Sequence, residues 1–392
     1  MADLPPEVIT EILTRLPVKS LLRFRCTCKS WRSQIDSPDF YFFHLHKSIE
    51  TTSNITIIFR ENSDLYAVDF DTLDKAVELN HPLMCYGNRL KVLGSCNGLL
   101  CICNVAEDIA FWNPSIRKHR ILPLIPTERR PDSDTSLFAA RVYGFGYDSY
   151  SNDYKLLRIS YFIDLHNRTF DSQVKLFSLR TNRWNSIQRM PYALCCARTM
   201  GVFVGGALHW VVTRKLEPDA PDLIVAFDLR FEIFQEVPLP ETGNESFQME
   251  VALLGGCLCM LANYQNMRVD VWVMKEYGSK ETWCKLFTLT HPNDSRSLKF
   301  VRPLTYSRDG NKVLVELDHR KLCWYDLINR SASFIKIPRM PTLIDGTICL
   351  GSLVPPNLES KKDKKHLELE TTKKRYRIYR DDFLSEGFKL VL

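Results

Sequence analysis

The sequence predicts a small all-α segment of three short helices, followed by an all-β propeller of about six four-stranded blades that a C-terminal strand closes. Three observations predict this fold class. Apolar residues recur at helical spacing from Pro5 to about Lys47, and at period two in short segments from Asn54 to about Pro355. Within the second region one unit recurs in six copies. The expected domains are residues 1–47, residues 54–355 and a basic tail over residues 356–392.

The helical segment opens with an amphipathic stripe. Its members, spaced by i, i+4 and i+8, are Val8, Ile9, Ile12, Leu13 and Leu16. Pro17 ends this helix, a second helical stretch runs from Val18 to about Ile35, and Ser37-Pro38 is expected to break the chain. A segment this short buries only a small core, so the stripe packs on the following domain or faces another protein.

The repeating unit of the second region is an apolar strand that ends at Asp, Asn or Ser, followed by a polar turn and another strand. Its centres, 44 to 65 residues apart, are Val68-Asp69-Phe70, Trp112-Asn113-Pro114, Phe177-Ser178-Leu179, Phe227-Asp228-Leu229, a degenerate Val273-Met274, and Tyr325-Asp326-Leu327. A hairpin with a Gly, Asn or Asp turn precedes most centres, so each unit supplies four strands. Repetition of this kind is typical of a β-propeller.

The first copy of the unit lacks one strand. It has strand-like segments at 55–59, 65–70 and 75–79, whereas a segment at 347–354 remains after the last copy without a local partner. We therefore predict that residues 347–354 complete the first blade and close the ring, because closure removes open sheet edges.

Composition excludes several classes of function. The chain has 392 residues, with 52 Lys and Arg against 46 Asp and Glu, and this excess is too thinly spread to favour nucleic acid or a membrane surface. The 13 cysteines form neither an even disulfide framework nor a zinc-binding spacing, so reduced thiols and a cytoplasmic or nuclear location are expected. The N-terminus does not resemble a signal peptide, and the longest apolar run, residues 251–262, is too short to span a bilayer.

The tail carries ten basic and seven acidic residues over 357–392. A solvated tail is the simpler interpretation, and a nuclear-import or docking patch is the alternative.

A run of residues near the N-terminus resembles the F-box. It spans residues 4–31 and includes the corners Leu4-Pro5 and Leu16-Pro17, with Cys28-Lys29-Ser30-Trp31 at its end and Ser37-Pro38-Asp39-Phe40 beyond it. The resemblance implies binding to a Skp1-like adaptor, and through it to cullin-1, in an SCF-type (Skp1, cullin, F-box) ubiquitin ligase. It assigns Skp1-binding roles to Leu4, Pro5, Ile9, Ile12, Leu13, Leu16, Pro17, Leu21, Leu22 and Trp31. A share of these residues is expected to face the internal packing of the helices instead.

The β region resembles the F-box-associated propeller domain of a large plant family that includes S-locus F-box proteins and regulators of intracellular immune receptors. The resemblance rests on residues 94–101 (GSCNGLLC), 112–118 (WNPSIRK), 144–148 (GFGYD), 154–157 (YKLL) and 206–210 (GALHW). It implies a substrate receptor whose propeller captures a target protein for ubiquitination and proteasomal degradation, in plant immunity or recognition. Such a receptor is not an enzyme and needs no cofactor, because a separate enzyme carries the ubiquitin thioester.

Two rival functions have less support in the sequence. A propeller enzyme, or a sugar- or metal-binding module, would use the central channel, but the sequence lacks the His-Glu-x-x-His, Gly-x-Ser-x-Gly and Gly-x-x-x-x-Gly-Lys motifs, and its nine histidines do not cluster. We therefore assign no catalytic or metal-binding residue. Nucleic-acid binding would rest on the tail, where only Tyr376 and Tyr379 interleave with the basic residues, so a stacking platform is poorly supported.

Loop parity predicts where a target protein binds. In a four-stranded blade, the connections between the second and third strands and between blades leave from one face, and the other turns leave from the opposite face. The compact turns, such as 96–98, 180–183 and 205–206, all belong to the second group. The longer connections, at 126–140, 163–170, 213–221, 241–247 and 290–297, gather on the first face. The target-binding residues predicted on this rim are Arg129, Arg130, Phe138, His166, Arg168, Phe170, Arg214 and Lys215.

Overall fold

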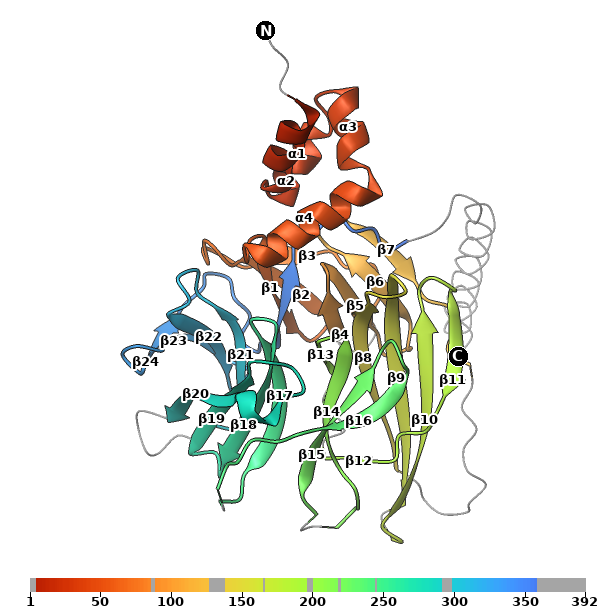
Figure 1. Ribbon diagram of the computed structural model, residues 1–392, viewed down its shortest axis with the longest axis vertical. Coiled ribbons are helices and arrows are strands. Elements are labelled where there is room, and N and C mark those ends of the chain that lie inside the picture. The colour runs from red at the N-terminus through yellow and green to blue at the C-terminus, as the bar shows by residue number, and fades with distance from the viewer. Residues whose placement is uncertain are drawn as a thin grey trace, which may run out of the picture. The chain divides into compact units, whose positions relative to one another are not determined.

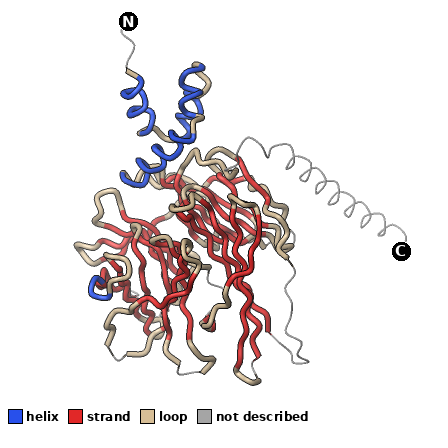
Figure 2. The backbone as a smooth tube through the Cα atoms, turned by 45° about the vertical axis from the view of Figure 1, so that its right-hand side comes forward, coloured by secondary structure: helices blue, strands red, loops and turns tan. Residues whose placement is uncertain are grey.

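The computed structural model describes residues 5–85, 89–126, 138–164, 166–195, 200–217, 220–243, 245–290 and 298–357, with only the backbone described at Pro6, Phe138 and Ala139. Helices form the N-terminal part of the described chain and strands form almost all of the rest, as Figure 2 shows by colour. The all-α and all-β regions of the sequence are therefore confirmed.

The described N-terminal region contains four helices, where the sequence predicts three. They are α1 (Pro6–Thr14), α2 (Val18–Phe24), α3 (Lys29–Ile35) and α4 (Pro38–Glu50). The second helical stretch, predicted from Val18 to about Ile35, divides at the turn before Cys28, whose Sγ caps α3 by accepting the Trp31 N–H at 3.4 Å.

The predicted break at Ser37-Pro38 is present, because α3 ends at Ile35, but the same pair also begins a further helix, α4. The Ser37 hydroxyl accepts the Phe40 N–H at 3.2 Å, Pro38 occupies the first turn and Asp39 adds a negative charge there. Each of these residues favours a helix N-terminus, since the first turn has free N–H groups and the positive end of the helix dipole. Proline is common both after the end of a helix and in the first turn of a helix. Here the capping hydroxyl of Ser37 places Pro38 in the first turn of α4.

The described strands form six antiparallel sheets, which are the blades of a propeller (Figure 1). Blade 1 contains β25 (Gly346–Leu350), β1 (Ile55–Glu61), β2 (Asp64–Asp69) and β3 (Val77–Leu79). Blade 2 contains β4 (Lys91–Cys96), β5 (Leu99–Cys103), β6 (Ile109–Asn113) and β7 (Lys118–Ile121). Blade 3 contains β8 (Phe138–Asp148), β9 (Asp153–Asp164), β10 (Thr169–Ser178) and β11 (Arg183–Ile187).

The other three blades follow in chain order. Blade 4 contains β12 (Ala193–Leu194), β13 (Val202–Val204), β14 (Ala207–Thr213), β15 (Asp222–Asp228) and β16 (Ile233–Val237). Blade 5 contains β17 (Gln248–Leu254), β18 (Cys257–Tyr264), β19 (Arg268–Met274) and β20 (Trp283–Thr290), with the short 3-10 helix η1 (Lys280–Thr282) before β20. Blade 6 contains β21 (Val301–Tyr306), β22 (Lys312–Leu317), β23 (Lys321–Asp326) and β24 (Ser331–Ile335).

The predicted ring closure is confirmed. Strand β25 pairs antiparallel with β1 from Ile55 opposite Leu350 to Phe59 opposite Gly346, so the end of the propeller sequence completes its first blade. The buried apolar side chains lie mainly between neighbouring blades; one cluster, for example, joins Ile57 and Val68 of blade 1 to Leu314 and Leu322 of blade 6. Each blade thus buries its faces against the next, as ring closure requires.

The centres of the repeating unit have a local structural role. Each lies at the end of a blade's third strand, where its side chain accepts backbone N–H groups of the following turn: Asp69 from Asp71, Asn113 from Ser115, Ser178 from Thr181, Asp228 from Arg230 and Asp326 from Ile328. Asp, Asn and Ser are the residues that stabilise a turn in this way. At the degenerate centre the Met274 Sδ accepts the Gly278 N–H at 3.1 Å instead, and the turn there is longer and contains η1.

Gly98 illustrates how tightly the closing segment fits the ring. Its φ is 81°, and a Cβ added there would lie 2.7 Å from the Leu350 carbonyl oxygen. Gly206 has a similar φ of 83°, but an added Cβ would meet nothing within 4 Å. The two glycines therefore share a backbone requirement and differ in packing.

We predict that Gly98→Ala lowers the free energy of unfolding by about 2 kcal/mol more than Gly206→Ala, because both changes place an L-residue in the left-handed region but only the first displaces backbone. Urea unfolding of both variants measures the difference. Equal losses of unfolding free energy in the two variants would show that the closing segment moves away from the added Cβ without loss of stability.

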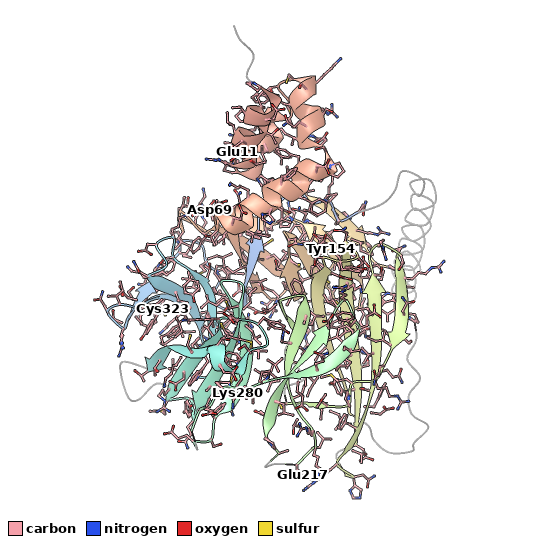
Figure 3. The ribbon with its side chains drawn as sticks, in the orientation of Figure 1. Glu11, Asp69, Tyr154, Glu217, Lys280 and Cys323 are labelled. Atoms are coloured by element: carbon pink, nitrogen blue, oxygen red, sulfur yellow. The ribbon has the colours of Figure 1, made fainter. Side chains whose placement is uncertain are left out.

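The strands divide the ring into two faces. The turn face carries the turns that join first to second and third to fourth strands, and the loop face carries the second-to-third connections and the links between blades. Figure 3 labels Asp69, at the end of a third strand, and Glu217, after a second strand, at opposite ends of the propeller. The parity on which the target-face prediction depends is therefore present in the structure.

Candidate functional site

The N-terminal helices pack on the segment that closes the ring. Leu353, which follows β25 and is 4% exposed, belongs to one buried cluster with Leu13, Leu21, Ile35 and Phe40 of the helices. Ile116, in a turn of blade 2 on the turn face, packs against the same cluster. The helical segment therefore has part of its core supplied by the propeller, as the excess of apolar residues predicted.

Asn113 holds the closing segment in place beneath the helices. This fully buried side chain donates from Nδ2 to the carbonyl oxygens of Ser352 at 3.0 Å and Val354 at 2.8 Å. Its Oδ1 accepts the N–H of Ser115, so the same side chain also stabilises its own turn. On the other side of the segment, the Gly351 N–H donates to the Asn54 carbonyl at 2.6 Å. Ring closure and attachment of the helices thus share one stretch of chain.

The structure separates the predicted Skp1-binding residues by burial. Leu13 and Leu21 are buried in the core that contacts Leu353. Ile9, Leu16, Leu22 and Trp31 are half-buried at its edge, whereas Pro5, Ile12 and Pro17 are exposed. Leu4 lies outside the described residues. Some of the predicted binding residues therefore pack inside the helical core. The others leave an exposed surface on the outer side of α1.

Exposed apolar residues mark that outward surface. On α1, Ile12 is 48% exposed and Val8, which was not among the predicted binding residues, is 42% exposed. Their positions four residues apart place them on one face of the helix. Exposed apolar side chains that gather on one small helical face are typical of a protein interface.

The predicted target-binding residues that the structure describes come from the loop-face ends of blades 3 and 4. His166 and Arg168 lie in the turn between β9 and β10, where the Asp164 carboxylate accepts the N–H groups of His166 and Asn167 at 3.0 Å each. Phe170 is half-buried on β10 and packs near Tyr161. Arg129 and Arg130 lie outside the described residues, as does the side chain of Phe138.

Two of these predictions need correction in detail. The connection predicted as long at 163–170 is a short turn between two long strands, β9 and β10, because these strands extend beyond the rim and carry the turn outward. Arg214 is not a free cation: its guanidinium makes a double contact with the Glu236 carboxylate, at 2.7 Å and 2.8 Å, and the Tyr192 hydroxyl donates to the same carboxylate. The Arg214 hydrogen bonds hold the pKa of Glu236 below its usual range.

Charged residues also gather where the last blade meets the first. Asp345, just before β25, accepts from Arg302 of blade 6 at 2.7 Å and from Arg60 of blade 1 at 2.9 Å. Burial alone would raise the pKa of Asp345, but the two guanidinium groups hold it below its usual value. This ionic clamp ties β21, β1 and the start of β25 together.

The same region contains Glu316 and His319, whose ligand atoms lie within 4.8 Å of those of Asp345. Glu316 accepts the Gly346 N–H at 2.8 Å and contacts His319 Nδ1 at 3.0 Å. Because the carboxylates already accept from two guanidinium groups and a backbone amide, the arrangement fits a clamp between blades better than a metal site.

His209 is buried between blades 4 and 5 and is hydrogen-bonded rather than free. Its ring nitrogens contact the Val202 carbonyl at 3.0 Å and the Tyr277 hydroxyl at 2.7 Å. Burial lowers the pKa of His209 to about 4, so the folded protein keeps this ring neutral at pH values where the unfolded chain is protonated.

We predict that His209 makes the protein sensitive to mild acid. A lowered folded-state pKa contributes full stability above the unfolded value, near 6.5, and this contribution is lost as the pH falls toward 4, at about 1.4 kcal/mol per pH unit. Urea unfolding at pH 6.5 and pH 5 should show a smaller acid loss for His209→Gln than for the parent. The matched control is His46→Gln, since that side chain is 77% exposed. An unchanged acid loss in His209→Gln would contradict the prediction.

Sequence comparison places these features in a known family. A family model described as "F-box domain" matches residues 1–43, and one described as "F-box associated beta propeller domain" matches residues 56–338. The chain is an F-box protein with an F-box-associated β-propeller. The family match ends before β25, so the closing strand lies outside it.

Relatives of this F-box protein match it over most of its length. It is 38% identical to the F-box protein CPR1 of Arabidopsis thaliana, with all of both chains covered. It is also 31% identical to the F-box/kelch-repeat protein At3g23880 of the same plant, over 91% of this chain and 96% of the relative. Within the part of the F-box protein that the structure describes, no helix is long and apolar enough to cross a bilayer.

Some residues that position the F-box carry no signal in the sequence. Leu353 and Ile116 are ordinary apolar residues in the strand and turn pattern, and their contact with α1 and α2 depends on how the chain returns after five further blades. Asn113 is visible in the sequence as a centre of the repeating unit, but its bonds to Ser352 and Val354 are not.

Proposed function

We propose that this protein is the substrate-recognition subunit of an SCF-type ubiquitin ligase. In this proposal the F-box docks on a Skp1-like adaptor, which links it to cullin-1, and the propeller captures a target protein for ubiquitination and proteasomal degradation. The protein itself performs no chemistry, because ubiquitin transfer belongs to another subunit. The target-binding surface is the loop face, including His166, Arg168, Phe170 and Lys215, with Arg129, Arg130, Phe138 and Arg214 as further members of the predicted rim.

The observation that carries the proposal is the arrangement of the F-box on the propeller. The helices bury one side against Leu353 and Ile116, on the turn face, and leave Val8 and Ile12 of α1 exposed. The longer connections of the propeller leave from the opposite face. One surface is therefore free for an adaptor and a separate surface is free for a target, which is what a linking subunit requires.

The adaptor interface is tested by placing a charge on the exposed face of α1. Ile12→Asp should reduce binding to a Skp1-like protein by at least a hundredfold, because a carboxylate buried without a partner in an apolar interface costs several kcal/mol. Ile12 is half-exposed, so the variant should still fold.

Ile328→Asp is the matched control, since Ile328 is 70% exposed in the turn after β23 of blade 6 and does not belong to the buried cluster of the helices. Co-purification and isothermal titration with the adaptor measure the effect. Binding that survives Ile12→Asp unchanged would refute the proposed interface, and equal loss in the control would show a general effect of the added charge.

The resemblance to regulators of intracellular immune receptors makes such receptors the first target proteins to test. Target abundance in plant tissue, with the proteasome blocked and released, should depend on both the F-box and the loop face. A receptor whose abundance does not change when the F-box is removed would be excluded as a target.

A further inference from the structure

One cation on the loop face differs from its neighbours in its pairing. Arg189 contacts Asp171 at 2.8 Å, Arg214 contacts Glu236 at 2.7 Å, and Lys215 lies 3.8 Å from Glu217. Arg168 is exposed, and no described residue forms an ion pair with it. It lies at the tip of the β9–β10 hairpin. The two strands of this hairpin, with 12 and 10 residues, are longer than any described strand of the other blades. The hairpin tip thus presents a guanidinium group without an ion-pair partner among the described residues, while the Asp164 carboxylate in the same turn accepts hydrogen bonds from the turn itself.

An open pocket of about 480 Å³ lies beside the base of this hairpin tip. Phe170, Met190 and Pro191 supply its apolar lining, and Ser172, Gln188 and the ion pair of Asp171 with Arg189 supply its polar lining. Met190 is buried, and its backbone is fixed by two hydrogen bonds with the Ser172 hydroxyl, each 2.9 Å long. The apolar wall is therefore formed before any partner binds, and the volume lies within the range of known ligand pockets.

Arg168 and the pocket are close along the chain. Arg168 is the last residue of the turn before β10 and Phe170 is the second residue of that strand, so their Cα atoms are at most about 7 Å apart. The Arg168 guanidinium group therefore lies near a pocket that has an apolar wall. Because the hollow is open to solvent and the cation is at a projecting tip, the pair suits a segment of another protein.

We propose that this hairpin site recognises a target segment in which an anionic side chain lies close to a large apolar side chain. The anionic group pairs with Arg168, and the apolar side chain enters the pocket formed by Phe170, Met190 and Pro191. This inference rests on the proposed function, since it names the chemistry of the target that the loop face captures. A carboxylate and a phosphate satisfy Arg168 through the same hydrogen-bonding geometry.

The test uses the full-length protein in complex with its Skp1-like adaptor. Short random peptides displayed on phage are selected on this complex, and the enriched sequences should combine Asp or Glu with a nearby Leu, Ile, Met or Phe. A synthetic peptide of the enriched type is then measured by fluorescence polarisation, with Asp, phosphoserine or Asn at the anionic position. Binding by the Asp or phosphoserine form, and not by the Asn form, is the expected result and distinguishes the two sources of charge.

Two variants remove the proposed contacts without disturbing the core. Arg168→Asn removes the charge, and asparagine tolerates the φ of 52° at this position well. Pro191→Asp places a negative charge at the wall of the pocket, where Pro191 is exposed. Each variant should weaken peptide binding at least tenfold while leaving adaptor binding unchanged.

Arg330→Asn is the matched control, because Arg330 is also exposed at a φ of 52° but lies on the turn face of blade 6. The inference is overturned if no acidic-apolar pattern is enriched, if both hairpin variants bind the peptide normally, or if Arg330→Asn is equally damaging. If the hairpin inference fails but the protein still binds the adaptor, the proposed function is unaffected. Failure of the parent protein to bind the adaptor would overturn the proposed function itself.

Discussion

A chain that ends after Met340 is expected to lose its cooperative fold, whereas a chain that ends after Asn357 should fold like the full-length protein. The shorter chain lacks β25, so β1 keeps an open edge inside the ring. It also lacks Asp345, which would leave the Arg60 and Arg302 guanidinium groups facing each other without a carboxylate between them.

The size of this effect follows from the side chains that the deletion removes. Ile344, Cys349, Leu353 and Val354 are each at most 4% exposed in the folded protein. Burial of one such side chain contributes about 1.5 to 3 kcal/mol, so together they approach the whole free energy of unfolding of a typical domain, about 5 to 15 kcal/mol.

Circular dichroism during heating and size-exclusion chromatography measure the outcome. The chain that ends after Asn357 is the control, because it loses only the tail and keeps every contact of the closing segment described above. A soluble, monomeric chain ending at Met340 with a single sharp melting transition would show that the ring closes without β25.

Leu353→Asp is expected to release the F-box from the propeller. The substitution places a carboxylate at a position that is 4% exposed, within the cluster that contains Leu13, Leu21 and Phe40. An unpaired charge in such a cluster costs about 3 to 5 kcal/mol, which the four short helices cannot offset by themselves.

Hydrogen exchange of backbone amides distinguishes this effect from general unfolding. In Leu353→Asp the amides of α1 and α2 should exchange at least a hundredfold faster, while those of the strands at blades 3 to 5 stay protected. Leu343→Asp is the matched control, since Leu343 is 47% exposed. Unchanged protection of the helices would mean that they hold together without the closing segment. Adaptor binding should weaken in parallel with the loss of protection.

Features that depend on residues near each other along the chain could be predicted from the amino-acid sequence. Helical spacing and period-two alternation separate the two regions, because each reports which face of a local element is buried. The Asp, Asn or Ser at the end of each third strand was visible as a repeat, because the turn it stabilises lies within the next three residues. Even the ring closure was predictable, since a blade short of one strand and a strand without a blade imply each other.

Other features depend on hydrogen bonds and packing contacts that the sequence pattern does not report. Ser-Pro is common both at a break between elements and at the start of a helix. Only the hydrogen bond from the Phe40 N–H to the Ser37 hydroxyl shows that a helix begins there. Arg214 pairs with Glu236 of the same blade, whereas Arg168 has no such partner among the described residues. The packing of the F-box on Leu353 joins residues more than three hundred positions apart. Such a contact produces no periodic pattern in the sequence, because it depends on where the end of the closed ring lies.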